Sequence, residues 1–281
     1  MNVCIIGLGL IGGSLAKDLR SSGFASHIIG LDSNTEHRGI ALRQGLVDEF
    51  LSFDAAISQS DLIILCTPVD SNCQFLPLIL DKIGDTRKVV ADMGSTKADI
   101  AKVVSSHPSR GRYVAVHPMA GTEYSGPAAA RENLFENKLA IICDRENCDK
   151  DAFSLVSQML ESLGMRTIFM NSSDHDIHVA YVSHISHITS FALALSVLDK
   201  EKDEENILSL AAGGFDSTVR LAKSNSETWA PIFLQNAAPV LEVIDNYIEK
   251  INLFRQCISD NNAEGLKSLM NKANKIKKIL N

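Results

Sequence analysis

The apolar positions of the first 170 residues fall into short runs that alternate with segments of helical length. Several runs are almost continuously apolar, which is typical of parallel strands covered on both faces. Between them, segments such as Gly13–Ser22, Val69–Ile83 and Thr96–Ser105 have the length of crossover helices. The alternation predicts a doubly wound α/β sheet. Seven runs are expected to form its strands: Asn2–Ile6, His27–Leu31, Leu62–Cys66, Lys88–Asp92, Arg112–His117, Leu139–Cys143 and Arg166–Met170.

The pattern changes after Met170, beyond which no further strand is expected. Ser173–Asp199 is expected to form one long helix, capped by Ser172 or Ser173. Leu266–Leu280 is expected to form a last amphipathic helix with solvated lysines. Between these two helices, apolar residues recur every three or four positions and predict a helix with one apolar face: Leu241, Ile244, Ile248, Ile251, Phe254 and Ile258. We therefore expect an α/β domain over residues 1–170 and an all-α C-terminal domain over residues 171–281.

Composition and charge narrow the class of protein. The 281 residues include 27 positive and 34 negative side chains, and the formal net charge of −7 argues against nucleic acid or an anionic membrane as the main partner. The uncharged run Val3–Ala16 is too short to span a bilayer and lacks the basic flank of a signal peptide. The six cysteines include no Cys-x-x-Cys pair and are expected to be reduced thiols. We expect a soluble, cytoplasmic protein that acts on a small molecule.

A glycine motif, Gly7-Leu8-Gly9-Leu10-Ile11-Gly12, follows the first predicted strand and opens a helix. In a Rossmann-type fold, the first glycine makes the tight turn and the second lets the backbone approach a pyrophosphate. The third lets the helix pack closely against the strand, and the phosphates lie on the amides at the helix N-terminus. Asp32 ends the second predicted strand, where its carboxylate can accept a hydrogen bond from a ribose 2′-hydroxyl. This favours NAD as the cofactor, while His37 and Arg38 leave NADP open.

Three polar clusters, Thr67-Pro68, Asp92–Lys97 and His117–Glu123, follow predicted strands. Ligands of open α/β sheets bind outside the carboxyl ends of strands, so we expect the three clusters to converge on one binding edge, with Thr67 and Pro68 at the cofactor. His117 is the best candidate for acid–base chemistry, because a neutral imidazole can accept a proton from a hydroxyl while hydride leaves the carbon that bears it. Ser95 is expected to hold the imidazole or the substrate hydroxyl, or alternatively to cap the following helix.

The predicted helical domain carries a second set of polar residues. His184 and His187 lie three residues apart on the long helix, and Arg220 follows further along the chain. A guanidinium can bind a carboxylate through two parallel hydrogen bonds, so Arg220 indicates an anionic substrate. His175 and His178, together with the first pair, raise the question of a metal site. No carboxylate or cysteine stands at ligand spacing to complete one, and we expect no metal.

Taken together, these motifs resemble those of the prephenate dehydrogenases of the bacterial tyrosine pathway. The similar segments are GLGLIGGSL from Gly7, DMGSTK from Asp92, HPMAGTEYSG from His117, SHISH from Ser183 and GGFDSTVRLAKSNSETW from Gly213. The resemblance runs from residue 1 to about residue 255. It implies an NAD-dependent oxidative decarboxylation of prephenate to 4-hydroxyphenylpyruvate, in an enzyme that forms a homodimer through its helical domain.

The resemblance also implies a role for each site residue. His117 would form a hydrogen bond with the 4-hydroxyl of prephenate, with Ser95 beside it. The other residues would belong to the substrate pocket: His187 and Arg220 at the acidic groups, His184 and Trp229 along the wall, and Glu123 at the mouth.

One departure and two rival functions remain open. The family often has a basic residue directly after GGF, where this chain has Asp216. Either Asp216 turns away and Lys223 or a partner-chain residue compensates, or the side-chain end of the pocket differs. A carboxylate there would suit the ammonium group of arogenate; we expect prephenate. A β-hydroxyacid dehydrogenase or imine reductase would share the two-domain plan, but the hydroxyacid enzymes usually place a catalytic lysine on the interdomain helix, which has none before Lys200. A non-catalytic NAD-sensing protein would bind NAD without turnover.

Overall fold

The computed structural model describes residues 1–203 and 207–279. Contacts between residues group Met1–Asn236 into one compact unit and the chain from Ala237 onward into a second. The first unit holds the sheet and the helices up to α10 (Ser226–Gln235), and the second holds α11 (Ala237–Ser259) and α12 (Ala263–Ala273).

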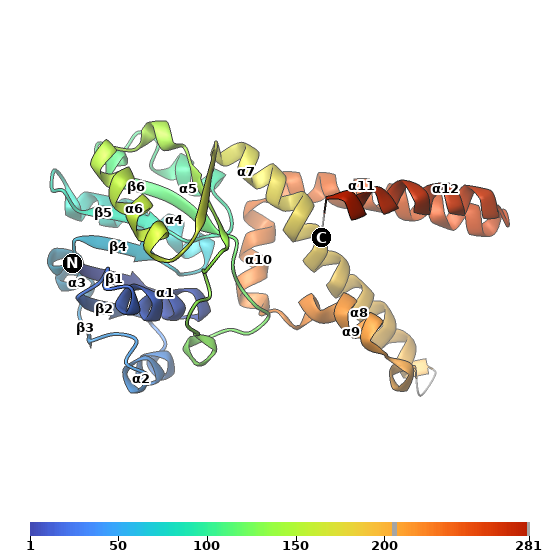
Figure 1. The fold of residues 1–281 in the computed structure, drawn as a ribbon, viewed down its shortest axis with the longest axis horizontal. Coiled ribbons are helices and arrows are strands. Elements are labelled where there is room, and N and C mark those ends of the chain that lie inside the picture. Colours follow the sequence, from blue (N-terminus) through green and yellow to red (C-terminus); the bar gives the residue numbers. More distant parts are fainter. Residues whose placement is uncertain (204–206, 280–281) are drawn as a thin grey trace. The chain divides into compact units, whose positions relative to one another are not determined.

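The first unit is built on an eight-stranded sheet in the order β3-β2-β1-β4-β5-β6-β7-β8. Figure 1 labels strands β1 to β6 of this sheet. All neighbouring strands pair in parallel except β6 and β7, which are antiparallel. The seven predicted strands are confirmed, with ends that differ by at most one residue. The strands are β1 Asn2–Ile6, β2 His27–Leu31, β3 Glu49–Phe50, β4 Leu62–Leu65, β5 Val89–Asp92, β6 Tyr113–Pro118, β7 Leu139–Cys143 and β8 Arg166–Met170.

Alternate residues of the central strand β1 enter two separate cores. Val3 and Ile5 pack in the core that contains α1 and α6, whereas Cys4 and Ile6 pack in the core that contains α3, α4 and α5. Both faces of the sheet are therefore covered, as the apolar runs predict. Fully burying one such aliphatic side chain stabilises the fold by about 1.5–3 kcal/mol. The helices are α1 Leu10–Ser21, α2 Thr35–Arg43, α3 Phe53–Gln59, α4 Val69–Ile83, α5 Ala98–Val103 and α6 Lys150–Ser162.

The helical part of the first unit begins directly after β8. The predicted long helix is present as α7 (Ser172–Val179), a π-helical turn (Ala180–His184) and α8 (Ile185–Asp203). Its cap is Asn171, whose side chain accepts a hydrogen bond from the Asp174 amide, and not Ser172 or Ser173 as expected. The amide of Ser172 instead donates to the Asp144 carboxylate at 2.9 Å. Two further helices complete the unit: α9 Gly213–Val219 and α10 Ser226–Gln235.

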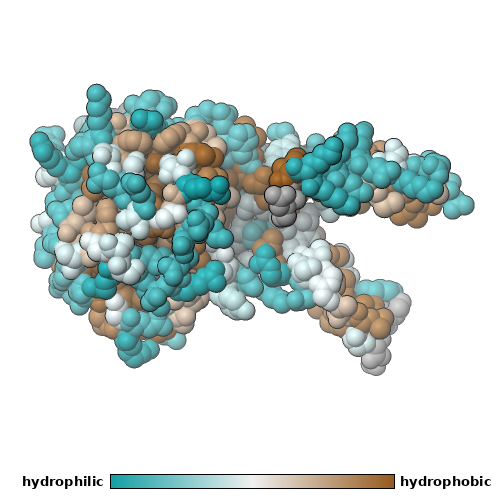
Figure 2. All heavy atoms as spheres, viewed as in Figure 1, coloured by the Kyte–Doolittle hydropathy of each residue, from teal (hydrophilic) through white to brown (hydrophobic). Residues whose placement is uncertain are grey.

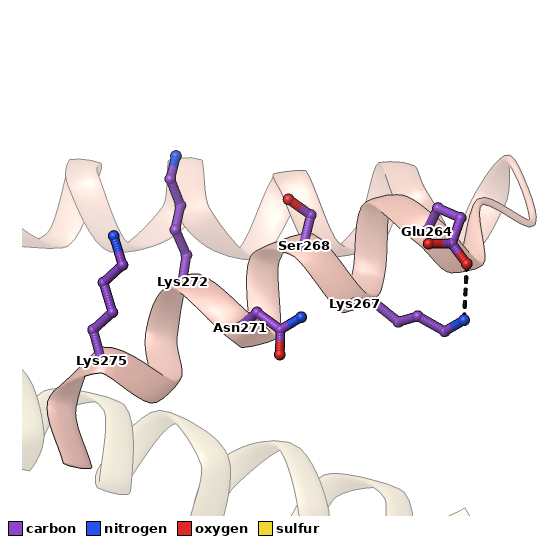
Figure 3. A pocket seen from close by; sticks show the side chains of 6 residues that line it. All are labelled: Glu264, Lys267, Ser268, Asn271, Lys272 and Lys275. Atoms are coloured by element: carbon purple, nitrogen blue, oxygen red, sulfur yellow. Dashed lines mark hydrogen bonds and ion pairs between the residues drawn. The ribbon is translucent and has the colours of Figure 1, made fainter. Parts of the chain in front are cut away.

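The second unit consists of α11 (Ala237–Ser259) and α12 (Ala263–Ala273), followed by a 3₁₀ turn. The expected last helix, Leu266–Leu280, therefore begins earlier and ends as an α-helix at Ala273; Leu280 lies outside the described residues. Side chains of α12 and the 3₁₀ turn line a shallow hollow of about 480 Å³, where Lys267 pairs with Glu264 at 2.8 Å (Figure 3). All its lining residues come from one stretch of helix, so these lysines are solvated charges.

Several helices carry exposed apolar side chains. On α11, four members of the predicted apolar face are exposed: Leu241, Ile248, Ile251 and Ile258. On α8, Leu195 and Leu198 are also exposed, and Figure 2 shows apolar surface over the α8–α9 segment. By length and composition alone, the stretch Ser172–Lys202 could cross a membrane, the one such helix among the described residues.

Candidate functional site

A cavity of about 650 Å³ lies at the carboxyl ends of the central strands. The strand order reverses between β1 and β4, and such a switch point is where open α/β sheets bind their ligands. Ten of the predicted site residues line this cavity: Gly7, Gly9, Leu10, Ile11, Asp32, Thr67, Pro68, Ser95, Glu123 and Trp229.

Five predicted site residues lie outside this lining: Gly12, His117, His184, His187 and Arg220. Gly12 packs against the turn before α1. His184, His187 and Arg220 each contact a residue of the lining, whereas His117 is buried on β6 beside His175.

The glycine turn has the shape that a dinucleotide requires. Gly7 has φ +92°, and a Cβ there would lie 2.7 Å from the Cys66 carbonyl oxygen. A Cβ at Gly12 would lie 2.0 Å from the Gly7 carbonyl oxygen, so only glycine allows α1 to pack this closely. Gly9 lines the cavity, and a Cβ there would meet nothing within 4 Å. Gly9 is also the N-cap of α1, and no side chain caps the amides of this helix end. The amides of the first turn of α1 can therefore hold a pyrophosphate.

Asp32 is held firmly at the end of β2. Its Oδ2 accepts a hydrogen bond from the Leu8 amide at 2.9 Å, and its Oδ1 accepts one from the Asn34 amide at 2.8 Å. His37 Nδ1 lies 3.5 Å from the same carboxylate. An ionised carboxylate has about four acceptor positions, so these contacts leave room for a ribose hydroxyl in the cavity.

Ser95 lies in a turn that is fixed by the buried carboxylate of Asp92. This carboxylate accepts hydrogen bonds from the Gly94 amide at 2.9 Å and the Tyr113 hydroxyl at 2.6 Å, and it also forms an ion pair with Lys97 Nζ. Asp92, Lys97 and Tyr113 are each fully buried. The turn thus has one stable conformation and presents Ser95 to the cavity. The buried contacts among these three residues were not expected, although Asp and Lys at the two ends of the DMGSTK segment were a signal for an ion pair.

Helix α5 takes its cap from another element, so the capping alternative for Ser95 does not apply. The N-cap position is Lys97, whose side chain makes no capping bond. Asp176, on α7, accepts hydrogen bonds from the amides of Lys97 and Ala98, both at 2.8 Å. The same turn is tied to α10, because Thr96 Oγ1 donates to Gln235 Oε1 at 2.8 Å.

His117 lies on β6, the neighbour of the strand that carries Asp92, and only 8% of the residue is exposed. Its Nδ1 is 2.8 Å from His175 Nε2, and His175 Nδ1 is 2.7 Å from Asp176 Oδ1. Burial lowers the pKa of His117 well below its usual value, and His175, Lys97 and His184 lower it further. His117 is therefore neutral at pH 7 and able to accept a proton.

The other two predicted histidines pack around Trp229 on α10. The His187 ring stacks on the indole with centroids 3.4 Å apart, and the His184 ring meets it edge-on at 6.0 Å. Asn236 Nδ2 donates to the Asp176 carbonyl oxygen at 2.7 Å and lies 3.1 Å from His184 Nδ1. Burial lowers the pKa of His184 to about 4 and also lowers that of His187. A bound carboxylate would raise the pKa of His187 again and so favour its charged form.

Arg220 and Glu123 meet at the edge of the cavity. Arg220 Nη1 donates to Glu123 Oε2 at 3.1 Å, with half of the arginine side chain exposed. The pKa of Glu123 is lowered by a hydrogen bond from its own amide and by Arg220. Since a guanidinium has five N–H donors, Arg220 can bind a second carboxylate while it keeps Glu123.

Asp216, the departure from the family pattern, forms an ion pair with Lys223 at 2.8 Å. Each group shifts the pKa of the other toward its charged form, raising that of Lys223 and lowering that of Asp216. Both side chains are exposed. The charge of Asp216 is therefore matched by a cation of its own chain.

Among the described residues, no group of three or more His, Cys, Asp and Glu side chains is placed to hold a metal ion. His175 and His184 instead have polar partners in the buried network, and His178 is exposed. All six cysteines are free thiols. Burial raises the pKa of Cys4 to about 12, so this thiol stays protonated at neutral pH.

Comparison with known families gives matches along most of the chain. Residues 15–169 match the nucleotide-binding domain of prephenate dehydrogenase, and residues 171–272 match the dimerization domain of the same family. The prephenate dehydrogenase of Bacillus subtilis is 32% identical over 270 residues, which cover 94% of this chain and 72% of that protein.

Two solved structures are also similar. The prephenate dehydrogenase from A. aeolicus, in complex with hydroxyphenyl propionate and NAD+, has 30% identity and a TM-score of 0.84, covering 99% of this chain and 98% of that one. The arogenate dehydrogenase of Synechocystis has 29% identity and a TM-score of 0.78, covering 99% of both chains. A sheet with its cavity at the switch point and a helical part that matches the family's second domain lead to one conclusion: the chain belongs to the prephenate dehydrogenase family.

Proposed function

We propose that this protein catalyses the NAD-dependent oxidative decarboxylation of prephenate to 4-hydroxyphenylpyruvate. The observation that carries the proposal is His117, a buried neutral base on the strand next to the Ser95 turn of the dinucleotide cavity. When bound, NAD supplies the hydride acceptor. Its pyrophosphate would lie on the first turn of α1, and its ribose against Asp32.

His117 accepts the proton of the substrate 4-hydroxyl as hydride leaves the carbon that bears it. The bond to the ring carboxylate then breaks, carbon dioxide leaves, and its electron pair makes the ring aromatic. The proton held by His117 returns to the phenol oxygen, so the residue ends the cycle neutral. Ser95 orients the hydroxyl from the cavity wall, and its fixed turn means that little reorganisation is needed.

Arg220 and His187 are proposed to bind the carboxylates of the substrate. Arg220 offers the charged, forked donor set that suits a carboxylate, and His187 lies against Trp229, which lines the cavity. His184 and Trp229 form the wall, and Glu123 closes the mouth by holding Arg220. These few groups must attract an anionic substrate to a protein with a net charge of −7.

Oxidation of arogenate is the second candidate function. The Asp216 carboxylate favours it, since a carboxylate near the substrate side chain would suit an ammonium group. The ion pair with Lys223 neutralises the Asp216 carboxylate and so removes this advantage. We therefore place prephenate first.

The direct test of this function is an assay of the purified protein with NAD and each substrate in turn. Prephenate should give absorbance at 340 nm and 4-hydroxyphenylpyruvate in the products, at a higher kcat/KM than arogenate gives. NAD binding in calorimetry without turnover of either substrate would contradict this function and is the result that a non-catalytic NAD-sensing protein predicts.

The helical residues 171–281 are proposed to act as a second domain, with the boundary near Asn171, that holds the substrate and joins two copies of the chain. The exposed apolar residues of α8 and α11 would be buried between the two subunits of a homodimer. Burial in a dimer also accounts for the apolar stretch Ser172–Lys202. Its first turn is capped by Asn171, and its Asp176 accepts a hydrogen bond from the Lys97 amide, contacts that suit a water-soluble, cytoplasmic enzyme.

Asp32 is expected to set the preference for NAD over NADP. Replacing Asp32 with alanine removes a ribose contact and the charge that repels a 2′-phosphate. We expect the KM for NAD to rise about 10- to 100-fold and the ratio of NADP to NAD use to increase, because one charge-assisted hydrogen bond contributes about 1.5–3 kcal/mol. Initial rates with both cofactors measure this ratio, and an unchanged ratio would show that Asp32 does not face the ribose.

The fall of kcat at low pH should report the protonation of His117. A base acts only in its neutral form, so activity falls as pH drops through its pKa, which burial places well below 6.5. We therefore expect kcat to stay constant from pH 7.5 to 6.5 and to fall only at lower pH. A fall centred at pH 6.5 or above would contradict the neutral, buried state of this residue.

A further inference from the structure

A row of three buried side chains connects the catalytic strand with helix α7. His117 Nδ1 lies 2.8 Å from His175 Nε2, and His175 Nδ1 lies 2.7 Å from Asp176 Oδ1. His175 is fully buried, Asp176 is 3% exposed and His117 is 8% exposed. The His117–His175 contact joins residues 58 positions apart in the sequence, so it depends on the packing of α7 against the sheet.

The positions of the protons along this row follow from the chemistry of Asp176. Its carboxylate accepts hydrogen bonds from the amides of Lys97 and Ala98, which an ionised group does best. A carboxylate that only accepts requires His175 to carry its proton on Nδ1. The Nε2 atom of neutral His175 is then an acceptor, and the proton in the 2.8 Å contact must belong to His117 Nδ1. The Nε2 atom of His117 is left with its lone pair.

The surroundings favour neutral rings in this row. Burial is the largest effect that lowers the pKa of both histidines. Lys97 lowers both pKa values further, and His184 lowers that of His117. Asp176 and Asp92 act in the opposite direction on His175, yet its pKa remains lowered. The neutral pair with one proton per ring is therefore the form present at pH 7.

We propose that His175 and Asp176 are positioning residues that fix the tautomer and orientation of His117, so that its Nε2 atom receives the proton of the substrate hydroxyl. The inference rests on the function proposed above. Without the row, an isolated imidazole divides between two tautomers and can rotate, and only one of these arrangements presents a lone pair to the substrate.

The test compares His175→Phe, His175→Gln and the control His178→Phe. Phenylalanine keeps the ring shape but offers no acceptor, whereas the glutamine amide oxygen can still accept from His117 Nδ1. We expect His175→Phe to lower kcat about 10- to 100-fold, a loss typical of removing a group that orients an imidazole. His175→Gln should retain most of the activity, and KM for NAD should stay unchanged in both. The control residue is exposed on the same helix, and its variant should match the wild type.

A second readout does not depend on turnover. In protein labelled with ¹⁵N-histidine, the His117 signal, assigned by its loss in His117→Asn, should show a protonated Nδ1 and an unprotonated Nε2 at pH 7. In His175→Phe the same signal should shift toward a mixture of tautomers. Should the wild type oxidise neither substrate, the function proposed above would fail, while the ¹⁵N spectrum would still decide the tautomer.

Three results would overturn the inference. One is a wild-type His117 that carries its proton on Nε2. Another is full activity of His175→Phe, and the third is an equal loss of kcat in the folded Phe and Gln variants. If the Phe variant does not fold, the wild-type spectrum and the Gln variant still test the assignment.

Discussion

Replacing His117 with asparagine is expected to lower kcat for prephenate oxidation by about 10²- to 10⁴-fold, the usual contribution of a positioned general base. The asparagine amide can donate to His175 Nε2 and so preserve the buried contact, but it cannot take up a proton. Because the cavity for the dinucleotide is lined by other residues, NAD affinity should stay within about twofold of the wild type. Stopped-flow absorbance at 340 nm and calorimetry with NAD measure the two quantities.

The control for this variant is His178→Asn, a change at an exposed histidine of α7 that should leave kcat unaltered. Circular dichroism would establish that both variants are folded. A drop in kcat of less than fivefold in folded His117→Asn would mean that another group, with Ser95 the nearest candidate, accepts the proton.

The pattern of apolar residues was sufficient to predict seven of the strands, because buried parallel strands require continuous apolar runs. It did not predict β3, since Glu49–Phe50 is only two residues long and has no such run. It also did not predict that β7 runs antiparallel to β6. The connection from Met119 to Lys138 contains only a short 3₁₀ turn and no crossover helix, so the chain returns from the same edge of the sheet.

The candidate site was predictable only where its residues follow strands. Gly7, Asp32, Ser95 and His117 each lie at or beyond a strand end, and topology places such positions along one edge. His175 was considered only as a metal ligand. Its contact with His117 arises from tertiary packing between residues 58 positions apart, and no sequence pattern indicates such a contact. The capping of α5 from another helix has the same origin.

Arginine 220 is the residue whose loss should most weaken substrate binding. In Arg220→Gln we expect the KM for prephenate to rise about 10- to 100-fold, since hydrogen bonds to charged groups contribute about 1.5–3 kcal/mol. The kcat should change by less than about threefold, because the guanidinium binds a carboxylate that does not react and interacts equally with the ground and transition states. Steady-state kinetics at saturating NAD separate the two parameters, and Arg166→Gln, a change at an exposed arginine on edge strand β8, is the matched control.

Removing Arg220 also removes the ion-pair partner of Glu123, whose negative charge then lies at the mouth of the cavity. Part of the rise in KM would then come from repulsion between this carboxylate and the anionic substrate. The double variant Arg220→Gln/Glu123→Gln should therefore bind prephenate better than Arg220→Gln alone, and a double-mutant cycle gives the coupling between the two residues. If kcat falls while KM stays constant in Arg220→Gln, the guanidinium acts on the reacting carboxylate in the transition state, and the assignment of Arg220 as a ground-state anchor is wrong.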